Sequence, residues 1–336
     1  MMLRTPKVSV FIPTFNRADM LRESIESVLQ QTYDDFELII SDNASEDATE
    51  SVVKSFDDSR IMYVKNDHNI GSRENWRRCF ALVKGEYIAI LPDDDLMVPE
   101  NLERKVRVLS SNARIGLVHS KYDLIDVDGL IVEPNQDAWG IPDRVDCLEN
   151  RQEMLYHAWN CINCSSVVFR KDCVDKIGQF TDKLWTGWDY EYWLRISLYY
   201  EVAFLASPLI RYRIHQKRES VEFYKDDEHL MFTIDMDVKR HFIKCHFGSL
   251  SGGPRMKSEI WRRMGERLKW IVQDLQYKRV PIARIRTLVF KDCIDYPELL
   301  RTSVVRKLLL RSVIGERAAT VLKKLLSPAA REAVPK

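Results

Sequence analysis

Three consecutive carboxylates, Asp93, Asp94 and Asp95, follow a short apolar segment at residues 87–91. That segment has the length and composition of a buried strand, so the three acids are expected at its carboxyl end. Adjacent carboxylates repel one another unless a positive charge lies among them, and Mg²⁺ and Mn²⁺ prefer hard oxygen ligands. Pro92 restricts the backbone just before the acids. The sequence therefore predicts a divalent cation here, with an acidic turn that binds no ligand as the alternative.

Two more polar clusters follow apolar segments. Residues 13–17 come after the apolar stretch 8–12, and Asp42 comes after the stretch 36–40. Because open α/β sheets bind ligands at the carboxyl ends of their strands, we expect Asp42 and the triple aspartate to be neighbours. Asp42 would accept a hydrogen bond from a nucleobase or a ribose, and the acids would hold a metal on a diphosphate. The alternative for a single Asp after a strand is a helix cap.

An aromatic-rich cluster at residues 185–195 is the second place where chemistry is expected. A helix is predicted from Tyr190, and Asp189 lies at or just before its start, where the helix-end amides favour an ionised carboxylate. Trp185 and Trp188 flank Asp189, and aromatic faces pack on the C–H surfaces of sugars. Asp189 is therefore a candidate general base beside a sugar, with a helix cap as the alternative.

A lone histidine, His215, closes a predicted strand at residues 209–214. An imidazole at a strand end is a candidate third metal ligand or phosphate donor, and a core or solvated histidine is the alternative.

Strand and helix patterns alternate four times within the first 95 residues, which predicts an α/β fold: a mainly parallel sheet with helices on both faces. No glycine-rich dinucleotide fingerprint and no Walker loop follow the first strand, so NAD and P-loop ATP binding are not expected. The strands are expected at 8–12, 36–40, 61–64, 87–91, 115–119, 165–170, 202–205 and 209–214, with a hairpin at 122–132. Helices are expected at about 21–29, 47–56, 72–83 and 99–110. Residues 133–151 are expected to form an irregular loop over the site.

Composition indicates a globular protein with a sizeable core. The 336 residues are 45% hydrophobic and 30% charged, and the net charge of +1 argues against a dedicated nucleic-acid binder. Seven cysteines without a disulfide-like rhythm fit a reducing cytoplasm, and the single pair Cys161 and Cys164 does not predict zinc. No signal peptide and no apolar run of 18 residues is found, so no transmembrane helix is expected.

The chain divides by charge into a body and a basic tail. From residue 251 to the end there are 20 Lys and Arg against 8 Asp and Glu. We expect a catalytic domain at 1–220 and a helical C-terminal region at 221–336, with helices at 259–276, 282–290 and 298–326. The basic, leucine-rich stretch 308–326 would lie on an anionic membrane surface, or else pack on the catalytic domain or form a homodimer.

Taken together, the motifs resemble a family 2 glycosyltransferase with the GT-A fold. The resemblance covers residues 7 to about 220. Three features depart from the family's pattern. Residues 41–45 lack the usual glycine, Pro92 occupies the position of the usual first Asp, and Trp188 occupies a position that is usually acidic. The matching segments, in the family's order, are Pro13–Arg17, Asp42–Ser45, Asn69–Gly71 with Asn75, Leu91–Asp95, Ile177–Phe180, Trp188–Arg195 and Tyr212–His215.

The resemblance implies a metal-dependent, inverting transfer of a hexosyl or deoxyhexosyl group from a nucleotide diphosphate-sugar to an acceptor hydroxyl. Asp189 would be the base, although Glu191 stays open, and Asp94, Asp95 and His215 would bind Mn²⁺ or Mg²⁺, with the choice among the three acids also open. The nucleotide sugar would be bound by Pro13, Thr14, Asn16, Arg17, Asp42, Asn69, Gly71, Asn75, Asp93 and Asp94.

Such an enzyme would build a bacterial surface polysaccharide or lipopolysaccharide on a glycan or lipid-linked glycan, in the cytoplasm at the inner face of the plasma membrane. A sugar nucleotidyltransferase is one alternative, but that class needs a glycine-rich loop where residues 13–17 have none. A non-catalytic nucleotide-sugar binding module is the other alternative, and it would not need Asp189 beside the metal.

Overall fold

The computed structural model describes residues 5–138, 140, 143–150, 153–154, 157, 159–215, 228–246 and 253–314. The chain forms two compact units. The first comprises Met1–Met154 and Asn160–Phe223, and the second comprises Leu155–Trp159 and Tyr224–Lys336. Each unit has its own sheet or helices and is described by itself.

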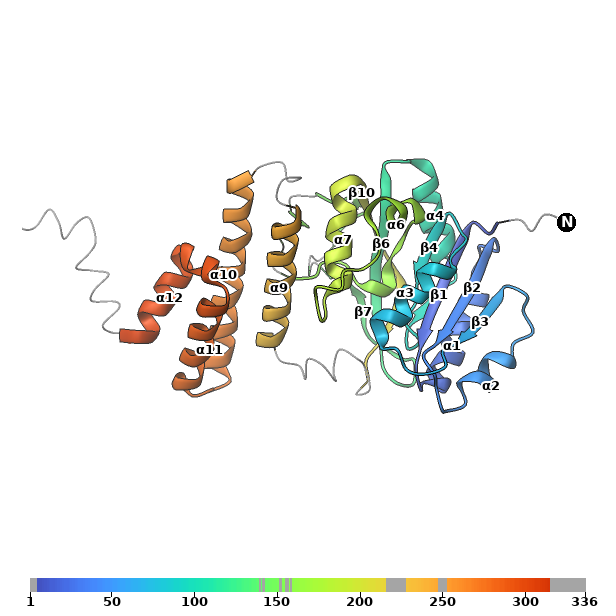
Figure 1. The fold of residues 1–336 in the computed structure, drawn as a ribbon, viewed down its shortest axis with the longest axis horizontal. Helices are drawn as coiled ribbons and strands as arrows, with labels where there is room; N and C mark the ends of the chain where they lie inside the picture. Colours follow the sequence, from blue (N-terminus) through green and yellow to red (C-terminus); the bar gives the residue numbers. More distant parts are fainter. Residues whose placement is uncertain are drawn as a thin grey trace, which may run out of the picture. The chain divides into compact units, whose positions relative to one another are not determined.

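The first unit is built on a ten-stranded sheet whose N-terminal half is parallel (Figure 1). Its strands are β1 (Val8–Thr14), β2 (Phe36–Asp42), β3 (Ile61–Lys65) and β4 (Tyr87–Ile90), in the order β3-β2-β1-β4. β1 and β2 are buried along their whole length, as expected for strands with helices on both faces. All four predicted strands are therefore present, with bounds shifted by one or two residues.

The other half of the sheet is mixed. β9 (Val168–Arg170) runs antiparallel between β4 and β6 (Ile115–Ile125), and β10 (Glu201–Arg213) runs parallel to β6. Three short or edge strands complete the sheet: β5 (Leu96–Met97), β7 (Ile131–Gln136) and β8 (Cys147–Leu148). β6 and β7 form the predicted hairpin, with Gly129 in a left-handed turn.

One expectation about this half was wrong. Residues 202–205 and 209–214 were predicted as two strands, but a single strand, β10, spans them. Its pairing with β6 shifts register on both sides of Pro208 and then continues. A proline that lacks an N–H is accommodated at such an irregularity without ending the strand. The predicted strand 165–170 likewise begins with a 3₁₀ turn, η1 (Cys164–Ser166), before β9.

Helices cover both faces of the sheet. One core joins the alternate β1 residues Val8, Val10 and Ile12 to α1 (Ala18–Leu29) and α4 (Asn101–Ser111). The opposite core contains Phe11 of β1. Successive strand residues point to opposite faces, so one strand serves both cores. The second core is covered by α3 (Ser72–Leu82), α6 (Lys171–Ile177) and α7 (Trp188–Tyr199), and the short α2 (Thr49–Lys54) packs beside α1.

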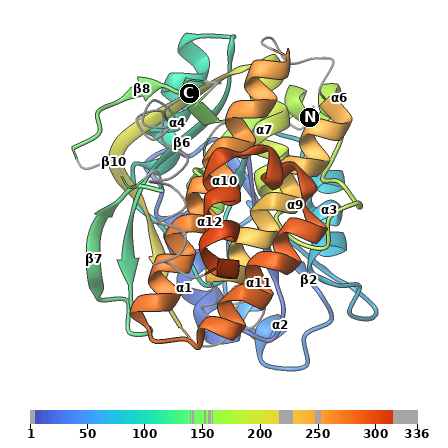
Figure 2. The ribbon, with the colours of Figure 1, turned by 90° about the vertical axis from the view of Figure 1, so that its left-hand side faces the viewer.

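The second unit is helical (Figure 2). Its elements are α9 (Glu228–His246), α10 (Gly253–Tyr277), α11 (Ile282–Asp295), the 3₁₀ turn η3 (Pro297–Arg301) and α12 (Ser303–Ile314). The sequence predicted α10 and α11 but not α9, and it predicted one helix over 298–326. A 3₁₀ turn and an extended Thr302 interrupt that helix, and residues beyond 314 lie outside the described part of the chain. None of the described helices is long and apolar enough to cross a membrane.

Candidate functional site

Three strand ends meet at one edge of the sheet. In the parallel register, Thr14 at the end of β1 pairs with Asp42 at the end of β2, and Asp42 pairs with Lys65 at the end of β3. β4 lies on the other side of β1 and leads into the triple aspartate. The polar clusters that follow these strands therefore lie side by side.

The triple-aspartate turn is bonded to the turn that follows β1. Thr14 Oγ1 donates to Asp93 Oδ2 at 2.7 Å, and Arg17 Nη1 donates to Asp93 Oδ1 at 2.8 Å. The same guanidinium nitrogen lies 3.3 Å from Asp94 Oδ2. Burial raises the pKa of Asp93 to about 6, and the negative charge of Asp94 adds to the rise although Arg17 opposes it. Thr14 and Arg17 therefore hold Asp93 against the turn that follows β1.

Asp94 and His215 face each other. His215 follows β10, and its Nε2 lies 3.0 Å from Asp94 Oδ2, with both side chains buried. A carboxylate oxygen and an imidazole nitrogen are ligands that suit Mn²⁺. No group of three or more His, Cys, Asp or Glu side chains in the described ranges is arranged to hold a metal. A nucleotide-bound Mg²⁺-type ion needs only one or two protein ligands, because substrate phosphates supply the others. The pair therefore fits such an ion.

Asp95 points elsewhere. It is 1% exposed, its Oδ1 accepts from the backbone N–H of Arg213 at 2.9 Å, and its Oδ2 accepts from Ser165 Oγ in η1. Burial, and then the charge of Asp94, raises its pKa well above the usual range. The geometry favours Asp94 over Asp95 as the partner of a cation, and the predicted role of Asp95 as a ligand stays a prediction.

The guanidinium of Arg213 joins the segments around the acids. It is 1% exposed on its side chain, and its Nε donates to the backbone carbonyl of Asp94 at 2.9 Å. Nη1 donates to Val127 O at 2.8 Å in the β6–β7 turn, and Nη2 donates to Glu23 Oε2 at 2.6 Å on α1. The sequence motif at 212–215 contained Arg213 but assigned it no role.

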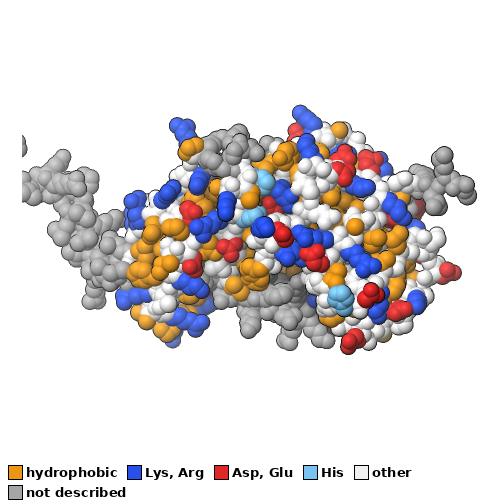
Figure 3. All heavy atoms as spheres, viewed as in Figure 1, with side chains coloured by type: hydrophobic (Ala, Val, Ile, Leu, Met, Phe, Trp, Pro, Cys, Tyr) orange, Lys and Arg blue, Asp and Glu red, His pale blue; other side chains and the backbone are white. Residues whose placement is uncertain are grey.

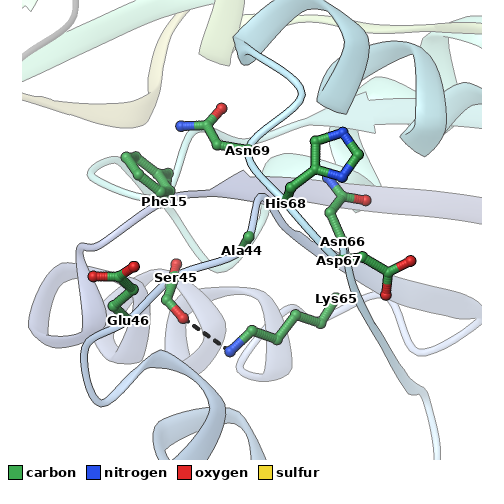
Figure 4. Close-up of a pocket in the computed structure, with 9 residues that line it drawn as sticks. All are labelled: Phe15, Ala44, Ser45, Glu46, Lys65, Asn66, Asp67, His68 and Asn69. Carbon is green, nitrogen blue, oxygen red and sulfur yellow. Dashed lines mark hydrogen bonds between the residues drawn. The ribbon is translucent and has the colours of Figure 1, made fainter.

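A hollow of about 480 Å³ lies beside these turns, at the ends of β1, β2 and β3 (Figure 4). Lys65 Nζ donates to the backbone carbonyl of Ser45 at 2.8 Å across its floor. The N–H of Phe15 lies 3.4 Å from Asp93 Oδ2, which connects the hollow to the acids. Figure 4 shows the rings of Phe15 and His68 on either side of Ala44. The lining residues are Phe15, Ala44, Ser45, Glu46, Lys65, Asn66, Asp67, His68 and Asn69.

Of the residues predicted to bind a nucleotide, only Asn69 lines this hollow. Sequence reasoning missed the others, although Phe15 lies inside the 13–17 motif and Lys65 ends a predicted strand. Asn69 Oδ1 accepts from the N–H of Gly71, which begins α3 with φ 85°. Pro13 is buried in β1.

Other predicted nucleotide residues support the walls of the hollow. Asp42 is fully buried, and its carboxylate accepts from the N–H of Ser45 at 2.8 Å and from Tyr63 Oη at 2.6 Å. Asn16, with φ 54°, accepts from the N–H of Glu46 at 2.9 Å. Asn75 is buried and accepts from Ser41 Oγ at 2.7 Å at the end of β2.

Asp189 is the second residue of α7, whose N-cap is Gly187 with φ 69°. Asp189 therefore does not occupy the cap position. Asn160 Nδ2 lies 3.4 Å from Asp189 Oδ2. Burial raises the pKa of Asp189, against the effect of the amides at the helix start. Burial raises the pKa of the Cys164 thiol well above its usual range, and the charges of Asp189 and Asp95 add to the rise.

Glu191, the other acid in this motif, is internal. It is 1% exposed and forms an ion pair with Arg195 Nε at 2.8 Å, one helical turn away. Arg195 in turn donates to the carbonyls of Ile177 and Gln179 at 2.6 and 2.8 Å. Through Arg195, Glu191 helps to hold the 177–179 turn against α7. Because Glu191 is engaged in this way, Asp189 is the better candidate for the base.

Comparison with known proteins gives consistent matches. A sequence profile described as "Glycosyl transferase family 2" matches residues 9–175. An uncharacterized glycosyltransferase of Methanocaldococcus jannaschii is 30% identical over 214 residues, 62% of this chain and 71% of that protein. Another, from Rickettsia typhi, is 31% identical over 216 residues, 63% of this chain and 65% of its own length.

A shorter match has a described activity. The UDP-Glc:alpha-D-GlcNAc-diphosphoundecaprenol beta-1,3-glucosyltransferase WfgD of Escherichia coli is 31% identical over 124 residues, 37% of this chain and 49% of WfgD. The chain thus spans less than two thirds of the length of WfgD and of the Rickettsia relative.

Two solved structures have a similar fold. Residues 1–349 of S. aureus TarS, solved with UDP-GlcNAc, give a TM-score of 0.57 at 15% identity, over 92% of each chain. The mannosyltransferase PcManGT from Pyrobaculum calidifontis, solved with GDP-Man and Mn²⁺, gives 0.52 at 16% identity, over 96% of this chain and 88% of the other. Identities this low show the fold alone, and the predicted GT-A type fold is confirmed.

We predict that Arg213→Met lowers the free energy of unfolding by about 3 kcal/mol, because a buried, hydrogen-bonded charge is removed and its partners are left unpaired. Urea denaturation of the purified protein measures this loss. The matched control is Arg114→Met, whose side chain is 77% exposed and whose loss should cost under about 0.5 kcal/mol. Equal stability of the two variants would show that Arg213 does not hold these segments together.

Proposed function

The chain belongs to glycosyltransferase family 2, and from this premise we propose that it transfers a sugar, with inversion, from a nucleoside diphosphate-sugar to an acceptor hydroxyl. The observation that carries the proposal is the facing pair of Asp94 and His215, which follows the same edge of the sheet as the hollow at the strand ends. Family membership favours transfer over the nucleotidyltransferase and binding-module alternatives.

The donor would be bound along the edge of the sheet. The hollow beside Phe15 offers an aromatic ring that is 41% exposed, together with the Asn69 amide and the Lys65 ammonium. An aromatic face with a few polar groups suits a planar nucleobase. Since the backbone of Phe15 contacts Asp93, a base in the hollow would leave its ribose near Asp93 and its diphosphate near Asp94.

Asp94 and His215 are the residues that would hold Mn²⁺ or Mg²⁺. Such an ion, when bound, neutralises the charge that gathers on the leaving diphosphate. One or two protein side chains are enough for an ion that is also bound through substrate phosphates, so this pair would suffice.

Asp189 would take the proton of the acceptor hydroxyl. A hydroxyl is a poor nucleophile until a base accepts its proton during attack, and burial makes Asp189 a stronger base than an exposed carboxylate. The helix start holds Asp189 in place and Asn160 lies beside its Oδ2. A single carboxylate that activates the acceptor, with no covalent intermediate, inverts the sugar's configuration.

The acceptor is proposed to be a glycan or lipid-linked glycan of a bacterial surface polysaccharide or lipopolysaccharide. WfgD, whose name describes a lipid diphosphate acceptor, supports this choice. A lipid-linked acceptor would place the enzyme at the inner face of the plasma membrane as a peripheral protein. A homodimer is the oligomeric state proposed for it. Hydrolysis of UDP-, dTDP- and GDP-sugars in Mn²⁺ would identify the donor.

We predict that Asp189→Asn lowers the turnover of sugar transfer by at least about 10²-fold, because an amide cannot accept the proton. Binding of the donor should survive, because the donor is proposed to be held by the hollow, Asp93 and Asp94 and not by Asp189. Nucleoside diphosphate release measures turnover, and calorimetry with the nucleoside diphosphate measures binding. The matched control is Asp182→Asn, a solvent-exposed acid ahead of α7. Normal turnover by Asp189→Asn would remove Asp189 from the base role.

We predict that EDTA stops transfer and that Mn²⁺ restores it. Asp94→Asn and His215→Ala should each weaken Mn²⁺ binding in the presence of UDP, measured by electron paramagnetic resonance. Asp95→Asn should weaken it less, because that carboxylate is engaged with Ser165 and the N–H of Arg213. Full activity in chelator would exclude the metal, and a larger effect at Asp95 than at Asp94 would reverse the assignment.

A further inference from the structure

Helix α11 carries apolar side chains on two opposite faces. Its inner face packs in the second unit through buried residues such as Val289. Its outer face presents Phe290, 43% exposed, and Ile294, 77% exposed. Residues three and four apart share a helix face, so these two side chains continue the row begun by Ala283 and Thr287. A helix already packed on its inner side has no structural need for this second apolar row.

Cations flank the outer row on both sides. At 100° per residue, Arg284 and Lys291 lie along one edge of the row and Arg286 along the other. No ion pair links these three cations to the residues that the structure describes. The neighbouring helix α10 differs, because Arg262 and Arg263 there both pair with Glu259. One exposed acid, Asp295, lies a turn beyond Lys291 on the same edge, and no ion pair joins the two among the described residues. Three cations against one acid leave an excess of positive charge along the outer row.

Exposed aromatic side chains are also present on α10, the helix before α11. Tyr277, at the end of α10, is 87% exposed, and Trp270 on the same helix is 54% exposed. Residues 253–314 contain 15 Lys and Arg against 6 Asp and Glu. Figure 3 shows hydrophobic and basic side chains interspersed over the C-terminal helices, with few acidic ones.

We propose that the outer face of α11 docks on an anionic lipid surface. A helix that lies in a membrane interface has an apolar row flanked by Lys and Arg, and Trp and Tyr favour the headgroup level. Phe290 and Ile294 would enter the boundary of the acyl chains, and Arg284, Arg286 and Lys291 would meet lipid phosphates. The proposal rests on the proposed function only in that a lipid-linked acceptor gives the docking a use.

A second copy of the chain fits this face less well. A two-fold interface sets the same patch of both subunits face to face. The patch holds three cations and one acid, Asp295, so a two-fold pairing would set surplus positive charge against surplus positive charge, and like charges in an interface disfavour the pairing. The sequence had pointed to 308–326 as the membrane-facing stretch, most of which lies outside the described residues; the structure assigns the role to α11.

The test is flotation of the full-length protein with vesicles of phosphatidylcholine alone, or mixed with an equal part of phosphatidylglycerol. The wild type should bind only the anionic vesicles. Arg284→Gln with Lys291→Gln should lower the partition coefficient by about 25-fold, at about fivefold per charge. Phe290→Gln with Ile294→Gln should also weaken binding. The matched charge control is Arg107→Gln with Arg114→Gln, on exposed residues of the first unit, which should bind as the wild type does.

Three results would overturn the proposal: no binding of the wild type to anionic vesicles, unchanged binding of both α11 variants, or a dimer in light scattering that only the Phe290 and Ile294 variant loses. The last result would make a second copy the occupant. Hydrolysis of the donor sugar is measured in parallel and should be equal in all variants. Vesicle binding without any hydrolysis by the wild type would reject the proposed function and leave the docking in place.

Discussion

The arrangement of the site depends on the buried guanidinium of Arg213. One side chain bonds the backbone of Asp94, the β6–β7 turn and Glu23 of α1, while the backbone of the same residue bonds Asp95. These four contacts join β10 to the acid turn, to the β6–β7 turn and to α1, and Ser24 Oγ of α1 also donates to the backbone carbonyl of Asp95. They also fix the end of β10, so that His215, two residues on, faces Asp94. The geometry of the proposed metal pair follows from this anchor.

The sheet supplies the other constraint. Parallel pairing of β1 with β2 and β4 brings three chain turns to one edge. Side chains then join neighbouring turns, since Thr14 Oγ1 donates to Asp93 and Ser45 Oγ accepts from the N–H of Asn16. The result is a division of labour among the acids. Asp42 and Asp95 accept hydrogen bonds from backbone amides and hydroxyls inside the structure. By contrast, Asp94 faces the imidazole of His215, and Asp189 faces the amide side chain of Asn160.

Local patterns in the sequence were enough to predict much of this fold. Buried strands and amphipathic helices in residues 8–111 were predicted almost to their bounds, because period and composition are local properties. The single strand across Pro208 was not, since pairing with β6 decides it. Motif order singled out Asp94, His215 and Asp189 as candidates, but it could not show which oxygen faces which partner. The contact between Arg213 and Glu23 spans 190 residues, and no local pattern encodes it.

The central claim is that a cation at the rim of the sheet is held by Asp94 and His215, beside the base. A crystal structure of the protein with Mn²⁺ and its nucleoside diphosphate tests this most directly. We expect Mn²⁺ to be bound by Asp94 and His215, the nucleobase to lie against Phe15, and the carboxylate of Asp189 to line the same cavity. Mn²⁺ bound through Asp95 instead, or Asp189 facing a separate cavity, would contradict it.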